Sequence, residues 1–90
     1  MDDHMNAENA DKIFKFILKC LRTSKPDLHS FVICIDDGKA FVNCEYGEVW
    51  INAITYDPDG NETRKQFAGT AVAAANYLIA RNADYYSIEQ

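Results

Sequence analysis

The side chains of this chain that could do chemistry are three cysteines, two histidines and a group of aspartates. The cysteines, at positions 20, 34 and 44, lack the Cys-x-x-Cys spacing of a zinc or redox site. Cys34 and Cys44 fall on opposite faces of the sheet predicted below, which excludes a disulfide between them. Reduced cysteines acting as small hydrophobes are typical of a reducing compartment. We therefore expect no cysteine nucleophile and a cytoplasmic location.

The two histidines also give no indication of a catalytic site. His4 lies in a polar N-terminal stretch, and His29 lies in a loop with no acid or nucleophile in pattern with it. The chain contains no Gly-rich phosphate loop, serine elbow or metal-ligand spacing. We predict a protein that is not an enzyme, with no catalytic residue, metal or cofactor.

The aspartates gather in predicted turns. Residues 57–61, Asp-Pro-Asp-Gly-Asn, are similar to half an EF-hand loop, but the glycine comes one position early and Ala68 takes the place of the twelfth-position glutamate. A calcium site is therefore not expected. Aspartates are common in solvated turns, and a cluster of them can also receive a basic partner. The cluster consists of Asp36, Asp37, Asp57 and Asp59.

Residues 31–67 predict a four-stranded antiparallel meander around which the rest of the chain is organised. Its turns are Asp37-Gly38, Tyr46-Gly47 and residues 57–60, since Asp-Gly between apolar runs is a strong hairpin signal. A two-residue loop at Asp37-Gly38 pairs Ile35 with Ala40. Alternation then gives an entirely apolar core face. Its residues are Phe31, Ile33, Ile35, Ala40, Val42, Cys44, Val49, Ile51 and Ala53.

The other face depends on the second turn. A two-residue Tyr46-Gly47 loop keeps Trp50 off the core face, whereas a three-residue loop would swap the faces and bury Glu48 and Asn52. The first register is preferred for that reason, although tyrosine is unusual at a positive φ. The second face then contains Val32, Cys34, Phe41, Asn43, Trp50, Asn52, Ile54 and Tyr56.

Two helices flank the meander. The first is predicted from a cap at Asn6 or Asn9 to Arg22, after a flexible segment 1–5, with an apolar stripe at the i, i+3, i+4 spacing. Thr70 caps the second, which runs to about residue 82. Its predicted buried seam is Ala71, Val72, Ala75, Leu78 and Ile79.

The whole order predicts one α+β domain over residues 6–90. It is a two-layer sandwich of type α-β-β-β-β-α, in which polar residues 61–66 form a charged edge strand. Residues 85–88 add either a short C-terminal strand or a packed tail.

The charge pattern makes the molecule electrically two-sided. The net charge is −5, yet residues 12–25 carry five bases and no acid. Helix, strands, helix is also the order of double-stranded RNA-binding domains, but residues 69–74 lack the lysines that start their second helix. We expect no direct nucleic-acid binding. No apolar run has the length of a membrane span, so no membrane partner is expected.

A partner surface follows if both helices cover the core face. The aromatic second face is then left open, unless a helix or the tail covers it, and exposed aromatic patches mark interaction surfaces. The predicted contact residues are Phe41, Trp50, Ile54 and Tyr56, with Asp36, Asp37, Asp57 and Asp59 orienting the partner. We predict a protein-interaction domain whose partner is a larger protein or a protein–nucleic acid complex.

In size, acidity and helix–sheet–helix plan the chain resembles the small phage-encoded inhibitors of bacterial defence systems, including anti-CRISPR proteins. The resemblance implies a stoichiometric inhibitor whose acidic turns occupy the basic nucleic-acid site of a defence complex. The alternative hypothesis is a homo-oligomeric structural or regulatory domain that dimerises through the aromatic face.

Overall fold

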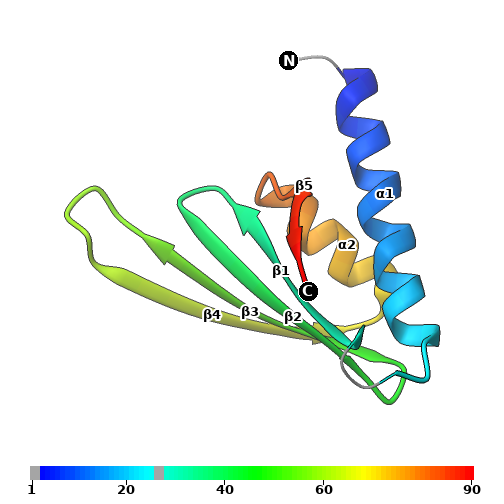
Figure 1. Ribbon diagram of the computed structural model, residues 1–90. Helices are drawn as coiled ribbons and strands as arrows, with labels where there is room; N and C mark the ends of the chain where they lie inside the picture. Colours follow the sequence, from blue (N-terminus) through cyan, green and yellow to red (C-terminus); the bar gives the residue numbers. More distant parts are fainter. Residues whose placement is uncertain (1–2, 26–27) are drawn as a thin grey trace.

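The computed structural model describes residues 3–25 and 28–90, and it confirms the predicted α+β fold with one antiparallel sheet (Figure 1). The elements in chain order are α1 (Asp3–Arg22), β1 (Ser30–Ile35), β2 (Gly38–Glu45), β3 (Glu48–Tyr56), β4 (Glu62–Gly69), α2 (Ala71–Ala80) and β5 (Asp84–Glu89).

The sheet has five strands in the order β4-β3-β2-β1-β5, and every neighbouring pair is antiparallel. The C-terminal segment is a strand, β5, which pairs with β1 at one edge. The polar strand β4 forms the opposite edge, as predicted for a charged edge that discourages sheet-to-sheet pairing. Both helices lie on the same side of the sheet (Figure 1).

The predicted core face is confirmed residue by residue, because all nine of its side chains are buried. The helices cover it with Ile13, Ile17 and Cys20 of α1 and with Ala74, Ala75 and Leu78 of α2. Phe16 of α1 packs edge-on against Phe31, with ring centroids 4.9 Å apart.

The first turn differs from the prediction. Ile35 pairs with Gly38, so the loop is Asp36-Asp37 and the register is two residues away from the predicted one. Asp37 itself takes the left-handed conformation, at φ 63°, which aspartate tolerates better than most residues. Because the shift is two residues and side chains alternate with a period of two, each residue keeps its predicted face.

Gly38 is needed for space rather than for a positive φ. A Cβ atom at this position would lie 1.8 Å from the backbone oxygen of Ile54 on β3. Gly38→Ala is therefore expected to push β2 away from β3 and to lower the free energy of unfolding by about 1–3 kcal/mol. Urea denaturation followed by circular dichroism measures this difference.

Gly60→Asn is the matched control for Gly38→Ala. Gly60 has φ +84° and nothing within 4 Å of an added Cβ, and asparagine tolerates the left-handed region. The free energy of unfolding should therefore change less in the Gly60→Asn variant than in the Gly38→Ala variant. Equal losses at the two glycines would contradict the close approach of β2 and β3.

The second and third turns agree with prediction. Glu45 pairs with Glu48 around a two-residue loop, and Tyr46 and Gly47 have φ values of 52° and 77°. Positive φ at both central positions is the type I′ pattern. In the third turn the Gly60 N–H donates to the Asp57 carbonyl at 2.9 Å.

The helices depart from prediction in two places. α1 begins at Asp3, ahead of the predicted caps, while residues 1 and 2 of the predicted flexible segment lie outside the described residues. Asn9 instead joins α1 to the start of β5, since its Nδ2 donates to the Ala83 carbonyl at 2.8 Å and its Oδ1 accepts from the Tyr85 N–H at 2.9 Å. No described helix has both the length and the apolar character needed to cross a bilayer.

The cap of α2 is confirmed, but its seam is rotated. The Ala73 N–H donates to Thr70 Oγ1 at 3.2 Å. Val72, predicted to be buried, is 57% exposed, while Ala74 is fully buried. Burial of Ala74, Ala75 and Leu78 sets the phase of the helix, and this phase turns Val72 toward the groove between α2 and α1.

Candidate functional site

The sheet face that points away from both helices is the candidate site, and we call it the open face. Its side chains alternate with the buried core residues along β1, β2 and β3, while β4 contributes an edge strand without a buried residue. They include every predicted aromatic contact residue. The helices do not cover it (Figure 1).

The strand registers arrange the open face in cross-strand rows, starting at the Tyr46-Gly47 end. Glu45 and Glu48 form the acidic row; Ser30, Asn43, Trp50 and Ala68 form the Trp50 row; Val32, Phe41, Asn52 and Gln66 form the Phe41 row; Cys34, Lys39, Ile54 and Arg64 form the basic row; Tyr56 and Glu62 form the Tyr56 row. At the β5 edge, Glu89 pairs with Val32 and Asp84 pairs with Cys34.

Three large aromatic residues of the open face are half exposed. Phe41 is 44% exposed, Trp50 48% and Tyr56 51%. Val32 is the cross-strand neighbour of Phe41, and Ile54 lies in the row between Phe41 and Tyr56; both are partly buried. Large apolar side chains therefore occur in four successive rows. A shallow hollow lies beside Trp50, where the facing residue on β4 is the small Ala68.

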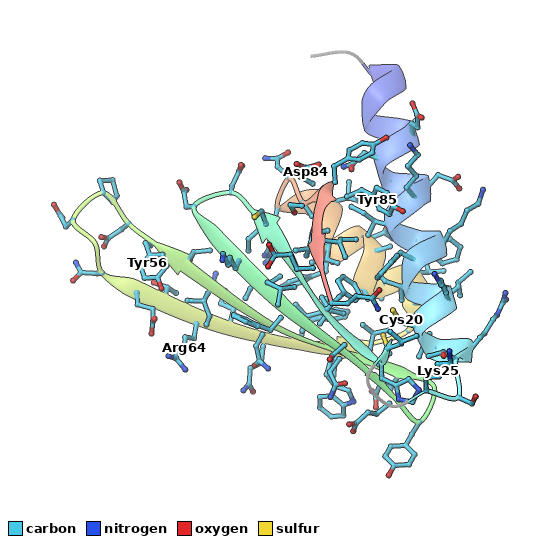
Figure 2. All side chains as sticks on the ribbon, viewed as in Figure 1. Cys20, Lys25, Tyr56, Arg64, Asp84 and Tyr85 are labelled. Carbon is cyan, nitrogen blue, oxygen red and sulfur yellow. The ribbon has the colours of Figure 1, made fainter. Side chains whose placement is uncertain are left out.

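The open face has opposite charges at separate levels. The acidic row carries two carboxylates, while the basic row carries Lys39 and Arg64, with Asp84 paired beside Cys34 at the β5 edge. Arg64 Nε contacts Glu62 Oε2 at 2.8 Å, and this hydrogen bond raises the pKa of the Arg64 guanidinium. Lys39 makes no ion pair within residues 3–25 and 28–90. Figure 2 shows Arg64 pointing away from the helices.

The predicted acidic residues lie at the ends of the first and third turns. The Tyr56 N–H donates to the Asp37 carbonyl at 2.8 Å, which brings the two turns to the same end of the sheet. Asp36 accepts a hydrogen bond from Asn82 Nδ2, so its carboxylate is turned toward the end of α2. Asp37 and Asp59 are exposed.

Asp57 holds the third turn together. Its Oδ1 accepts from the backbone N–H groups of Asp59 at 2.9 Å and Asn61 at 2.8 Å, and its Oδ2 accepts from Asn61 Nδ2 at 3.2 Å. These donors, the Asn61 N–H first, lower the pKa of the Asp57 carboxyl. The Asp57 carboxylate, predicted to contact a partner, is therefore already used in hydrogen bonds within its own turn.

The stability that Asp57 contributes should depend on pH. Because its pKa is lowered in the folded state, the contribution is complete well above the ordinary value of 3.8 and is lost as pH falls through the folded-state pKa. Asp57→Asn should lower Tm at pH 7, and the Tm difference from the parent chain should shrink toward pH 2. Thermal unfolding at the two pH values measures it.

Asp59→Asn removes a charge from the same turn and is the control for the pH experiment. The described part of the chain shows no hydrogen bond to the Asp59 carboxylate, so this variant should change Tm less at pH 7. A Tm difference for Asp57→Asn that grew toward acid pH would contradict the assignment.

The predicted basic face of α1 is partly neutralised. Lys12 Nζ lies 3.3 Å from Glu8 Oε1, and Lys15 Nζ lies 2.9 Å from Asp11 Oδ2. Lys12 also donates to the Tyr86 hydroxyl. Two of the five bases in residues 12–25 therefore have acidic partners earlier in the same helix.

His29 and two of the cysteines have structural surroundings. His29 Nε2 donates to the Thr23 carbonyl at 2.8 Å, which links the residue before β1 to the end of α1. Cys20 and Cys44 are buried, and Figure 2 shows Cys20 on the side of α1 toward the sheet. A hydrogen bond with Cys20, together with burial, raises the pKa of the Cys44 thiol.

These surroundings predict one fast-reacting thiol. Cys34 is exposed on the open face, while Cys20 and Cys44 are each only 2% exposed. A thiol reagent at pH 8 should therefore modify only Cys34 quickly, and the other two after denaturation. Cys34→Ser should remove the fast phase, and fast modification of Cys20 or Cys44 would contradict the core packing.

Sequence reasoning missed the basic row of the open face. It paired Lys39 with Asp36 at the end of the second face and treated residues 61–66 only as a charged edge strand. The signal was present, because the third turn fixes the pairing of Tyr56 with Glu62, and period-two counting then puts Arg64 beside Ile54. Gln66 and Ala68 follow on the same face.

Comparisons of the chain with protein-family models, curated proteins and solved structures find no match.

Proposed function

We propose that this chain is a non-catalytic protein-binding domain that docks through the open face. The supporting observation is the sheet face left uncovered by both helices, with Phe41, Trp50 and Tyr56 each exposing about half of its surface. Large aromatic side chains at the centre of an interface carry most of the binding energy in known complexes.

The free energy gained by burying the exposed aromatic surface is sufficient for specific docking. A large aromatic side chain buries about 150–250 Å² in full, so covering the exposed half removes roughly 75–125 Å² from water. At about 25 cal/mol per Å² this is worth about 2–3 kcal/mol for each ring. Burial of three rings therefore supplies a binding free energy that offsets much of the entropic cost of association.

Charges around the rings would set orientation and rate. The two glutamates of the acidic row and the aspartates of the turns surround the aromatic centre, and such rims affect on-rate and register more than affinity. The hypothesis of a stoichiometric inhibitor of a defence complex remains a prediction, since no related protein is found.

Site-specific photo-crosslinking tests the proposed docking face. A photo-crosslinking phenylalanine analogue is placed at Asn52, in the middle of the open face, or at Asn76, an exposed residue of α2. In cells that express the chain, the probe at position 52 should give a discrete protein adduct and the probe at position 76 should not. An adduct only from position 76, or none from position 52, would contradict the proposal.

A further inference from the structure

We infer that the partner of the open face is a second copy of this chain, bound face to face about a two-fold axis that runs across the strands. This inference rests on the proposed function and names the partner for the same surface. It is carried by the order of the rows along the strands, because that order is complementary to its own reverse.

The acidic row and the basic row lie on opposite sides of the Trp50 and Phe41 rows, and the Tyr56 row lies beyond the basic row. Along β2 the open face reads Glu45, Asn43, Phe41 and Lys39, so a carboxylate and an ammonium group are at its two ends. On β3 and β4 the same levels hold Glu48 and Arg64, and Arg64 is also paired with Glu62 of its own chain. The Trp50 row and the Phe41 row lie between them.

A two-fold axis in the plane of the interface and perpendicular to the strands reverses the order of the rows. The acidic row of one copy then lies against the basic row of the other, and the Trp50 row lies against the Phe41 row. Each such contact occurs twice, as an isologous interface requires. Lys39, which has no ion pair among the described residues, faces Glu45 of the second copy.

The other face-to-face arrangement is disfavoured by the same charges. A two-fold axis parallel to the strands keeps every row at its own level, so the acidic row would lie against itself and the basic row against itself. Like charges brought together in an interface cost several kcal/mol. The row order therefore selects antiparallel stacking of the two sheets.

Sheet geometry permits the stacking. Two packed sheets cross at about 30° and lie about 10 Å apart. At the ends of the rows this angle displaces the contacts by about one strand spacing, which the long side chains of Lys39 and Arg64 can span. The result is a four-layer particle with the helices outside and the Trp50 and Phe41 rows of both copies hidden.

The area of the face indicates a weak, reversible dimer. The acidic and basic rows are about 20 Å apart along the strands, and four strand axes span about 14 Å. With side-chain width included, each copy contributes roughly 500 Å², which is less than the ~800 Å² of a standard interface. We expect a dissociation constant on the order of 10 μM.

Charge-swap complementation followed by sedimentation equilibrium tests the arrangement. One variant carries Glu45→Lys with Glu48→Lys, and the other carries Lys39→Glu with Arg64→Glu. Each variant alone opposes like charges in both contacts, so its dissociation constant should rise at least about 10-fold. An equimolar mixture should restore the dimer, because every contact then joins opposite charges.

Three results would overturn the inference. The parent chain could stay monomeric at about 1 mM; the dimer could persist in both variants, which would place the contact elsewhere; or the mixture could fail to restore the dimer, which would exclude the antiparallel stacking. Circular dichroism confirms that each variant is folded. A chain that stays monomeric but crosslinks to a different protein from position 52 would overturn the inference that the partner is a second copy. It would leave the proposed docking through the open face standing.

Discussion

Replacing Ile51 by alanine is expected to lower the free energy of unfolding by about 2–4 kcal/mol. Ile51 is 1% exposed at the centre of β3 and lies in the core between the sheet and the helices. Truncation would remove buried apolar surface and leave a cavity. For a 90-residue domain with a total stability of about 5–10 kcal/mol, this is a large fraction, and denaturant unfolding measures it.

Trp50→Ala is the matched control for Ile51→Ala. The two residues are neighbours on β3, but Trp50 is on the open face and is 48% exposed. The loss at position 50 should be smaller, about 1 kcal/mol or less, because no closed cavity forms. If the Trp50 variant lost as much stability as the Ile51 variant, the open face would be a second core and not an exposed surface.

Trp50→Ala should have its large effect on docking instead. A half-exposed tryptophan beside a hollow is the type of residue that dominates interfaces, where truncation costs 2 kcal/mol or more. Binding through the open face should therefore weaken by about 30-fold or more. Phe41→Ala should weaken it in the same direction, and titration calorimetry or sedimentation provides the constants.

Val72→Ala is the control for the docking experiment. Val72 is an exposed apolar side chain, 57% accessible, but it belongs to α2 on the covered side of the sheet. Its removal should leave docking unchanged within about two-fold. A larger loss for Val72→Ala than for Trp50→Ala would move the docking surface to the groove between the helices.

The faces of the sheet could be predicted because they depend only on alternation. Within each of β1, β2 and β3 every second residue up to Ala53 is apolar and lies on the core side, and this pattern survives any shift of an even number of residues. The burial of Ile33 and the exposure of Trp50 follow from it directly. The choice of a two-residue loop at Tyr46-Gly47 was correct for the same reason, since the alternative buries polar groups.

The register of the first hairpin could not be predicted, because contacts distant in sequence fix it. Gly38 lies against the backbone of Ile54 on the next strand, and the backbone N–H of Asp36 donates to the Arg81 carbonyl at 2.9 Å. Local turn chemistry favours glycine in the loop, but these two contacts place it in the strand. The side of α2 that is buried could not be predicted either. The helix contains alanines on several sides, and only packing against the sheet determines which of them are buried and that Val72 is exposed.

The rows of the open face became visible only when the pairing was known. Sequence reasoning identified the aromatic residues but assigned the charge of the site to the turn aspartates. Two of those carboxylates, of Asp36 and Asp57, are engaged by Asn82 and by the third turn. The complementary charges on the face itself, Lys39 and Arg64 against the acidic row, require the β2–β3 and β3–β4 registers.

Acrylamide quenching of Trp50, the single tryptophan of the chain, tests the central claim most directly. In dilute solution the ring should be readily quenched, because only half of it is covered by the domain's own atoms. Under conditions where the chain is docked, quenching should fall and the emission should shift to the blue. A tryptophan already shielded in the dilute monomer, or one still fully quenched in the docked state, would contradict docking through the open face.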